Sequence, residues 1–326
     1  MSLIRSNAID LLPSPAEWER LSVVPEKRNA FSRDLYFREC WADTASFFDD
    51  SASKILRSLA VLTMKPDAVV GRRMTRILDY TADQGFVPIA VAPLHLTRHS
   101  IRELWRYDWH VYPVTRLVFS THWYTSTETL IFVLQEVGQQ QRFLPASVRL
   151  SSLKGSALPD ERKRGDLRTM LDPPNRILNF VHVTDEPADI VRELGIFLDL
   201  RERRALLKQI KQHWGKNRRE TAAREIARLE ALHPEHDLDF MASLGRLEAC
   251  SAVTHAAAEH ARKLFHHGDK VGWDDLCSIV DPSAADRWDF ICVASNLIVY
   301  EREASPGVLS ADVVANRWSR VVEEWV

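Results

Sequence analysis

Four short runs rich in apolar residues limit this chain to folds that bury a β-sheet. TLIFVLQE (129–136) gives the strongest strand signal because β-branched and aromatic residues dominate it. The other three are LAVLTM (59–64), FVPIAVAPLHLT (86–97) and RILNFVHV (176–183). Runs of this length and composition indicate strands.

Helical patterns alternate with these runs. Met74 and Ile77 share one face of a helix that Gly85 is placed to stop. Ser100 and Glu103 have capping-box spacing at the start of a second helix. The order strand, helix, strand, helix, strand, polar loop, strand, helix predicts an α+β fold with an antiparallel sheet and helices packed on its faces.

Three local features of this region are less regular. Residues 117–121 suggest a further short strand, and residues 137–175 read as a polar, irregular loop. After the last strand, Thr184 or Asp185 is placed to cap a helix.

Helix-forming segments flank the strand-rich region. Ser14 and Glu17 in SPAEWERL form a capping-box signal at the N-terminal side, and the sequence becomes helix-forming and charge-rich after residue 199. We therefore predict a helical N-terminal extension (1–58), a central domain (59–200) and a helical C-terminal domain (201–326).

Composition narrows the classes of function. The formal net charge is -2, with 27% charged and 45% hydrophobic residues, so no overall basic field attracts nucleic acid. Residues 201–228 hold ten lysines and arginines against three glutamates, but their helical spacing favours a solvated face or a charged protein contact over nucleic-acid binding. No run approaches the roughly 18 apolar residues of a membrane span, and the N-terminus lacks a signal peptide. We expect a cytoplasmic protein without membrane contact.

Cysteines and histidines do not predict a protein-held metal. The four cysteines are far apart and form no C-x-x-C pair, which argues against a zinc site and against a disulfide framework. The C-terminal histidines lack the H-E-x-x-H spacing of a zinc helix. We predict no protein metal ligands.

Four polar residues near expected strand ends suit phosphoryl transfer. Lys65 follows the first strand and Arg164 closes the polar loop, and a lysine point charge and an arginine fork hold phosphate oxygens in complementary ways. His182 ends the last strand just before a helix N-terminus, which favours a phosphate group. Glu193, about two turns into that helix, is placed to fix the imidazole tautomer. Each of these residues alone is more simply interpreted as structural, but together they favour a catalytic role.

The motifs that contain these residues resemble those of the nucleoside diphosphate kinases. LTMKPDAV, RGD and NFVHVTD occur in that family's order across about residues 59–199. The resemblance implies a ferredoxin-like antiparallel sheet, here in a divergent member with helical extensions at both ends.

The resemblance also implies roles for individual residues. His182 would be phosphorylated in a ping-pong transfer, and Glu193 would orient it. Lys65 and Arg164 would hold phosphates. Asn179 would hold the sugar hydroxyl and phosphate of the nucleotide.

Further residues match the family pattern with altered spacing or identity. Arg149 and Ser156 correspond to a pair of phosphate contacts in the polar loop, and Trp105 stands for a family tyrosine at the nucleotide. Val183 replaces the family's glycine after the histidine and adds bulk beside the nucleophile. Val114 falls where the family has an aromatic residue that stacks on the base.

The resemblance implies a phosphotransferase that takes phosphate from a Mg²⁺-bound nucleoside triphosphate such as ATP and passes it to a nucleoside diphosphate. It also implies a homo-oligomer. Two alternatives stay open: a specialised kinase for a non-nucleotide acceptor, and a nucleotide-binding sensor or scaffold protein without turnover.

Overall fold

A four-stranded antiparallel sheet lies at the centre of the computed structural model, which describes residues 12–107, 112–137, 144–300 and 311–323. The strands are β1 (Leu59–Met64), β2 (Phe86–Leu94), β3 (Thr129–Glu136) and β4 (Val181–Val183). Their order in the sheet is β2-β3-β1-β4, and each neighbouring pair is antiparallel. Strands β1 and β2 are thus parallel but separated by β3, as β3 and β4 are by β1. This interleaving is ferredoxin-like, and it confirms the predicted fold class.

Helices make up most of the remaining chain. Those of the central region are α5 (Pro66–Val70), α6 (Met74–Asp83), α7 (Arg98–Leu104), α8 (Val114–Tyr124), α9 (Ala146–Lys154), α10 (Leu167–Leu171) and α11 (Pro187–Phe197). Before them come α1 (Pro15–Leu21), α2 (Pro25–Phe31), α3 (Leu35–Phe48) and α4 (Ala52–Arg57). After them come α12 (Leu200–His213), α13 (Arg219–Leu232), α14 (Phe240–Ala249), α15 (His255–His267), α16 (Trp273–Ile279), α17 (Arg287–Leu297) and α18 (Ala311–Glu323). None of the helices in the described ranges could cross a membrane.

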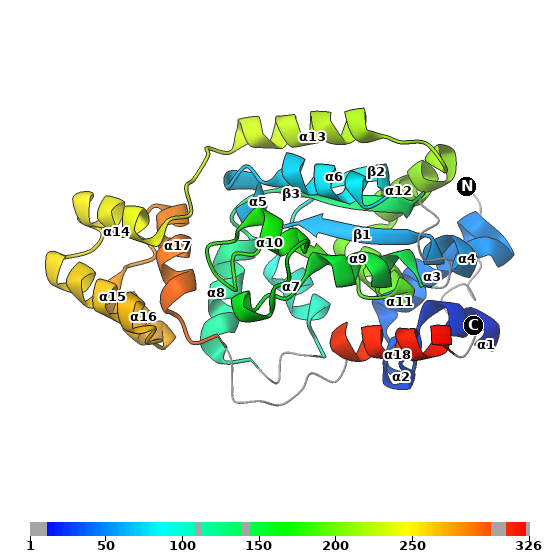
Figure 1. Cartoon of the computed structure of the whole chain (residues 1–326), viewed down its shortest axis with the longest axis horizontal. Helices are drawn as coiled ribbons and strands as arrows, with labels where there is room; N and C mark the ends of the chain where they lie inside the picture. The colour runs from blue at the N-terminus through cyan, green and yellow to red at the C-terminus, as the bar shows by residue number, and fades with distance from the viewer. Residues whose placement is uncertain (1–11, 108–111, 138–143, 301–310, 324–326) are drawn as a thin grey trace.

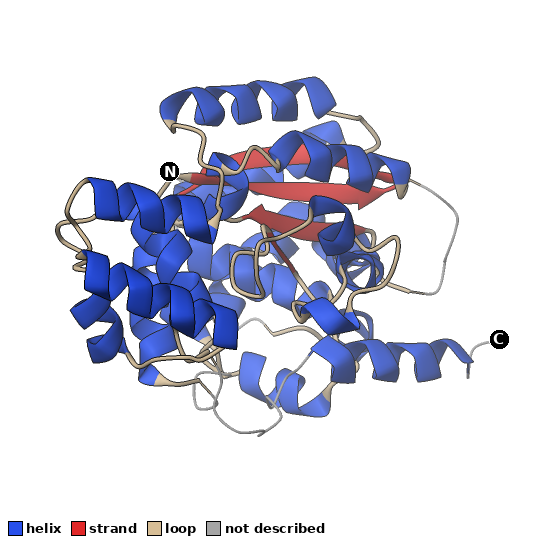
Figure 2. Ribbon diagram, turned by 60° about the vertical axis from the view of Figure 1, so that its left-hand side comes forward, coloured by secondary structure: helices blue, strands red, loops and turns tan. Residues whose placement is uncertain are grey.

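The two central strands form the core. Every residue of β1 is buried, and so is every residue of β3 except the last. Strands buried on both faces need cover on both faces, and helices lie on both sides of the sheet in Figure 2.

The N-terminal extension packs tightly on the helix that follows β4. A Cβ atom added at Gly195 of α11 would lie 2.2 Å from the carbonyl oxygen of Tyr36 in α3, so only glycine permits this approach. Arg192 of α11 donates from Nε to Asp34, the N-cap of α3, at 2.7 Å.

A buried cluster of charges joins both ends of the chain to the start of α11. Lys27 of α2 lies 2.7 Å from Asp189 and 3.1 Å from Glu186. The Glu186 carboxylate also accepts from the Ser22 hydroxyl at 2.6 Å and from the Trp318 indole of α18 at 2.9 Å. Burial raises the pKa of Asp189 to about 7, against the attraction of the lysine.

Helices α12 and α13 cover the edge strand β2, along which α13 runs in Figure 1. The Arg218 amide between them donates to the Pro88 carbonyl at 2.7 Å. Some of their basic residues pair with acids elsewhere in the protein, for example Arg203 with Asp43 at 2.7 Å and Arg228 with Glu128. A sheet edge that could recruit another strand is thereby closed.

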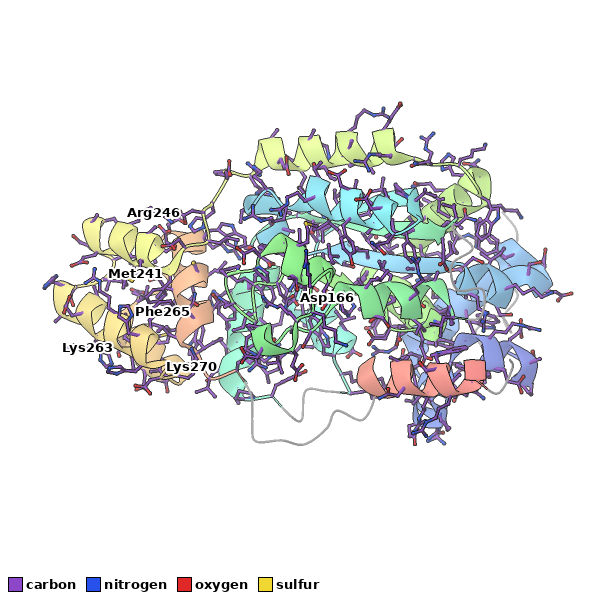
Figure 3. All side chains as sticks on the ribbon, viewed as in Figure 1. Asp166, Met241, Arg246, Lys263, Phe265 and Lys270 are labelled. Atoms are coloured by element: carbon purple, nitrogen blue, oxygen red, sulfur yellow. The ribbon has the colours of Figure 1, made fainter. Side chains whose placement is uncertain are left out.

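Helices α14 to α17 form a lobe beside α8, at the left of Figure 1. Phe265 of α15, labelled in Figure 3, stacks on Phe240 of α14 with ring centroids 4.0 Å apart. His122 of α8 stacks on Trp273 of the lobe at 5.3 Å. Aromatic packing of this kind joins the lobe to the central region.

Several local predictions were wrong. Residues 117–121 lie in helix α8, and the polar segment contains the helices α9 and α10. The N-cap of α7 is Thr97, with Ser100 as its capping-box partner, and the N-cap of α11 is Glu186. The start of α7 is set by the local bonds between Thr97 and Ser100, whereas residues 117–121 pack as a helix against α7 and α17, which short-range propensity does not record.

Candidate functional site

The candidate site lies where β1 and β4 meet. His182 of β4 pairs with Thr63 of β1, one residue before β1 ends. Lys65 follows directly and its amide donates to the Phe180 carbonyl at 2.9 Å. The sheet register therefore brings two distant motifs together at one end of β1.

His182 is held by the predicted partner. Its Nε2 lies 2.9 Å from Oε1 of Glu193, and the two side chains are 19% and 8% exposed. A carboxylate can only accept a hydrogen bond, so Nε2 carries the proton and Nδ1 keeps its lone pair in the neutral ring. That tautomer makes Nδ1 the nucleophilic nitrogen.

Two neighbours of this histidine are Trp105, which contacts its ring, and Val183, which follows it in the strand. The Trp105 ring meets the His182 ring edge-on, with centroids 5.9 Å apart. Val183 is fully buried in the core. Successive side chains of a strand point to opposite faces, so Val183 and His182 lie on different faces of β4. The valine therefore adds no bulk on the face of β4 that carries the histidine.

Lys65 is buried beside Asn179. Its Nζ donates to the Asn179 side-chain oxygen, donates to the Ile177 carbonyl at 3.3 Å, and lies 4.5 Å from the centroid of the Trp123 ring. Burial, opposed by the attraction of Asp67 and assisted by the nearby Arg168, lowers the pKa of Lys65 to about 7.

Asp67 fixes the turn that precedes β4. Its carboxylate accepts from the Phe180 amide at 2.7 Å and from the Trp123 indole at 3.0 Å. Phe180 has a φ of 69°, a left-handed backbone conformation that residues other than glycine rarely adopt. Because the histidine lies two residues later, this anchored turn sets where β4 begins.

Arg168 of α10, rather than Arg164, reaches this group. It is buried, and its Nη2 donates at 3.2 Å both to the Asn179 side-chain oxygen and to the Val181 carbonyl. Arg164 lies in an exposed turn, and within the described ranges it makes no contact with Asn179 or His182. No sequence signal separates these two arginines, since both lie in the same basic segment.

Of the two other predicted loop residues, Arg149 lies apart from His182 and Ser156 lines a cavity. Arg149 pairs with Glu136 at 2.9 Å and donates to the Gln84 carbonyl at 2.8 Å. Glu136 lies beside the start of β1, so Arg149 is at the opposite end of the sheet from His182. Ser156 donates to Glu161 at 2.7 Å and lines a cavity between α9 and α10.

The cavity measures about 530 Å³ and lies next to the β4 motif. Its polar and charged lining residues are Ser151, Ser152, Lys154, Ser156, Glu161, Lys163, Asp166, Arg168 and Asp185. Asp166, labelled near the centre of Figure 3, is remote from the lobe of α14 to α17. Asp185 accepts from Ser151 at 2.8 Å and lies 3.7 Å from Lys154.

The described side chains were considered as possible ligands of a metal ion. Within the described ranges, no group of three or more histidine, cysteine, aspartate or glutamate side chains comes together as a metal site. Mg²⁺ takes oxygen ligands and commonly binds through substrate phosphates and water.

No family model matches the chain, and no curated protein matches its sequence. Solved structures similar to it include an NDP kinase from Pyrobaculum aerophilum, at 16% identity and a TM-score of 0.36, over 44% of this chain and 97% of that chain. The Aquifex aeolicus nucleoside diphosphate kinase is 18% identical with a TM-score of 0.36, over 44% and 97%. A Halobacterium salinarum nucleoside diphosphate kinase in complex with CDP is 19% identical with a TM-score of 0.35, over 44% and 89%. These three likenesses each span less than half of this chain.

Proposed function

We propose that the protein is a phosphotransferase that carries phosphate on His182. The observation that carries the proposal is the 2.9 Å contact between His182 Nε2 and Glu193. Lys65 and Arg168 are bonded to the carbonyls of the two residues that precede His182. An oriented neutral imidazole beside fixed cations is what phosphoryl transfer through histidine needs.

The transfer would proceed in two balanced steps. In the first, Nδ1 of His182 attacks the terminal phosphorus of a nucleoside triphosphate, and the diphosphate leaves with the electron pair of the broken P–O bond. In the second, an acceptor oxygen takes the phosphoryl group and the P–N bond breaks. Glu193 would stabilise the positive ring that exists between the two steps, and Lys65 and Asn179, which are bonded to each other, would hold the charged oxygens. Mg²⁺, bound through the phosphates, would neutralise part of their charge.

The direct test is incubation of the protein with γ-labelled ATP and Mg²⁺, followed by a chase. We expect an acid-labile label on the protein that diphosphates remove. A protein that binds ATP but acquires no label would support the sensor or scaffold alternative instead.

Two observations favour an acceptor other than a nucleoside diphosphate. Val114, at the position that corresponds to the base-stacking aromatic, is 64% exposed. The cavity beside Trp105, Tyr124 and Tyr300 has room for about 20 Å³, which holds little more than one water molecule. A chase with a panel of diphosphates and of small phosphate acceptors separates these classes by which compounds remove the label.

Replacing Glu193 should slow the chemistry more than it weakens binding. In Glu193→Gln the amide can no longer stabilise a positive ring, so we expect labelling of His182 to slow roughly a hundredfold. Affinity for Mg²⁺-ADP, measured by calorimetry, should change less than about threefold because the amide preserves the shape. Equal labelling rates in the variant and the wild type would contradict the role of Glu193.

Binding of a nucleotide should take up protons at slightly alkaline pH. A lysine whose folded pKa is lowered to about 7 is largely neutral at about pH 8, and a bound phosphate favours its charged form. We therefore expect the heat of ADP binding at that pH to depend on the ionisation enthalpy of the buffer. Lys65→Met should remove most of this dependence, whereas the exposed Lys54→Met should keep it. Identical observed heats of binding in Tris and in HEPES, before any correction for buffer ionisation, would argue against the lowered pKa of Lys65.

A further inference from the structure

The cavity between α9 and α10 contains cations whose hydrogen bonding is incomplete. Arg168 is 8% exposed, and its Nε has no hydrogen-bond partner among the residues that the structure describes. Its Nη1 donates to the Gly155 carbonyl at 2.9 Å, so the guanidinium is fixed at the cavity wall. A buried, fixed and partly unsatisfied guanidinium is an unusual feature for a purely structural arginine.

Arg168 of the cavity wall shares a single neutral acceptor with Lys65, which lies outside the cavity lining. The Asn179 side-chain oxygen accepts from Nζ of Lys65 and from Nη2 of Arg168. Burial lowers the pKa of Arg168 to about 10 and lowers that of Lys65, so the surroundings do not compensate either charge fully. An amide oxygen carries no charge, and an anion would satisfy both cations better.

Lys154 lines the same cavity as Arg168. It donates to the Ser151 hydroxyl at 3.3 Å and lies 3.7 Å from Asp185, which is a loose contact for a lysine. Burial lowers its pKa, as does the nearby Arg168, while Asp185 and Glu193 oppose the shift. Glu193, the partner of His182, is thus one of the carboxylates that attract Lys154.

The acids of the cavity are already bonded within the protein. Asp166 accepts from the Lys163 amide at 2.8 Å, and Glu161 accepts from the Ser156 hydroxyl at 2.7 Å. Asp185 is held by Ser151 at 2.8 Å. The serine hydroxyls are used as donors as well, so the donors left for an anion are on the cations, first of all Nε of Arg168.

We propose that this cavity binds the phosphate chain of the donor, with Arg168 and Lys154, in place of Arg164, as its cations. The inference rests on the proposed function for the identity of the anion as an oligophosphate. A volume of about 530 Å³ falls within the roughly 300–1,000 Å³ of small-molecule sites. The adjacent Val181 carbonyl, bonded to Arg168, links this site to the strand that carries His182.

The test measures binding of inorganic tripolyphosphate to the full chain by calorimetry, without a nucleoside or turnover. Loss of a charge-assisted fork should weaken binding about tenfold to a hundredfold in Arg168→Gln, and Lys154→Gln should weaken it about tenfold. Arg164→Gln is the matched control, since it removes the same charge four residues away in an exposed turn, and should change the affinity less than about twofold. Arg168→Lys keeps the charge without the fork and should give an intermediate affinity.

Outcomes of this experiment separate the inference from the phosphohistidine chemistry. Tripolyphosphate affinity that falls with Arg168→Gln and Lys154→Gln supports the cavity even if ATP leaves no label on His182. Unchanged affinity in both variants, or an equal loss in Arg164→Gln, overturns it, and labelling of His182 would then still stand. Thermal unfolding identifies a variant that does not fold, and if Arg168→Gln fails in this way then Lys154→Gln decides.

Discussion

Replacing His182 by alanine should lower phosphoryl transfer by about four orders of magnitude, because a transfer that forms a covalent intermediate has no substitute nucleophile at this place. The acid-labile label should disappear entirely. Binding of Mg²⁺-ADP should change little, since the cations that would hold the phosphates remain. Stopped incubation with labelled ATP and calorimetry measure the two effects separately.

His99→Ala is the matched control for that experiment. His99 is an exposed residue of α7, the helix that ends next to Trp105. Its removal should leave labelling within about twofold of the wild type, as expected for an exposed surface residue. If His182→Ala and the wild type acquired the same label, another residue would be the phosphate carrier.

The second large effect concerns stability. Lys27→Met keeps most of the side-chain volume but removes the cation from between Glu186 and Asp189. Two carboxylates would then share a buried site without compensation, and removal of one partner of such a group costs about 3–5 kcal/mol. Urea unfolding should show this loss, whereas the exposed Lys54→Met should change the unfolding free energy by less than about 0.5 kcal/mol.

The pH dependence of this loss gives a check on its cause. The folded pKa of Asp189 is raised by burial to about 7, above that of an unfolded aspartate. Folding therefore favours the protonated form, and this contribution is complete at low pH and is lost as the pH rises through about 7. The destabilisation of Lys27→Met should accordingly shrink between about pH 8 and pH 6. A loss that is the same at both pH values would point to packing instead of charge.

The strands and the central pair of the site could be predicted because their signals are local. β1 and β3 coincide with two runs whose apolar, β-branched composition is continuous. His182 and Glu193 are separated by eleven residues across one strand and one helix, so their contact depends on few long-range choices.

Other parts depended on packing that no short segment encodes. The segment that became α8 contains valine, threonine and phenylalanine, which favour strands, but α7 and the lobe of α14 to α17 pack against it as a helix. Which arginine meets Asn179 depends on the course of the loop before α10, so Arg168 could not be distinguished from Arg164 by spacing. The N-cap of α11 is likewise decided by Lys27 and Trp318, which come from opposite ends of the chain.

The cover over β2 also has a consequence for how the protein is made. The chain that closes this edge comes after the whole sheet, so a ribosome releases β2 long before Arg218 can reach Pro88. During that interval the exposed strand edge is open to pairing with other chains. A polypeptide interrupted near residue 200 would keep His182, Glu193, Lys65 and Arg168 yet retain the open edge, and its yield would be limited by aggregation before its chemistry could be measured.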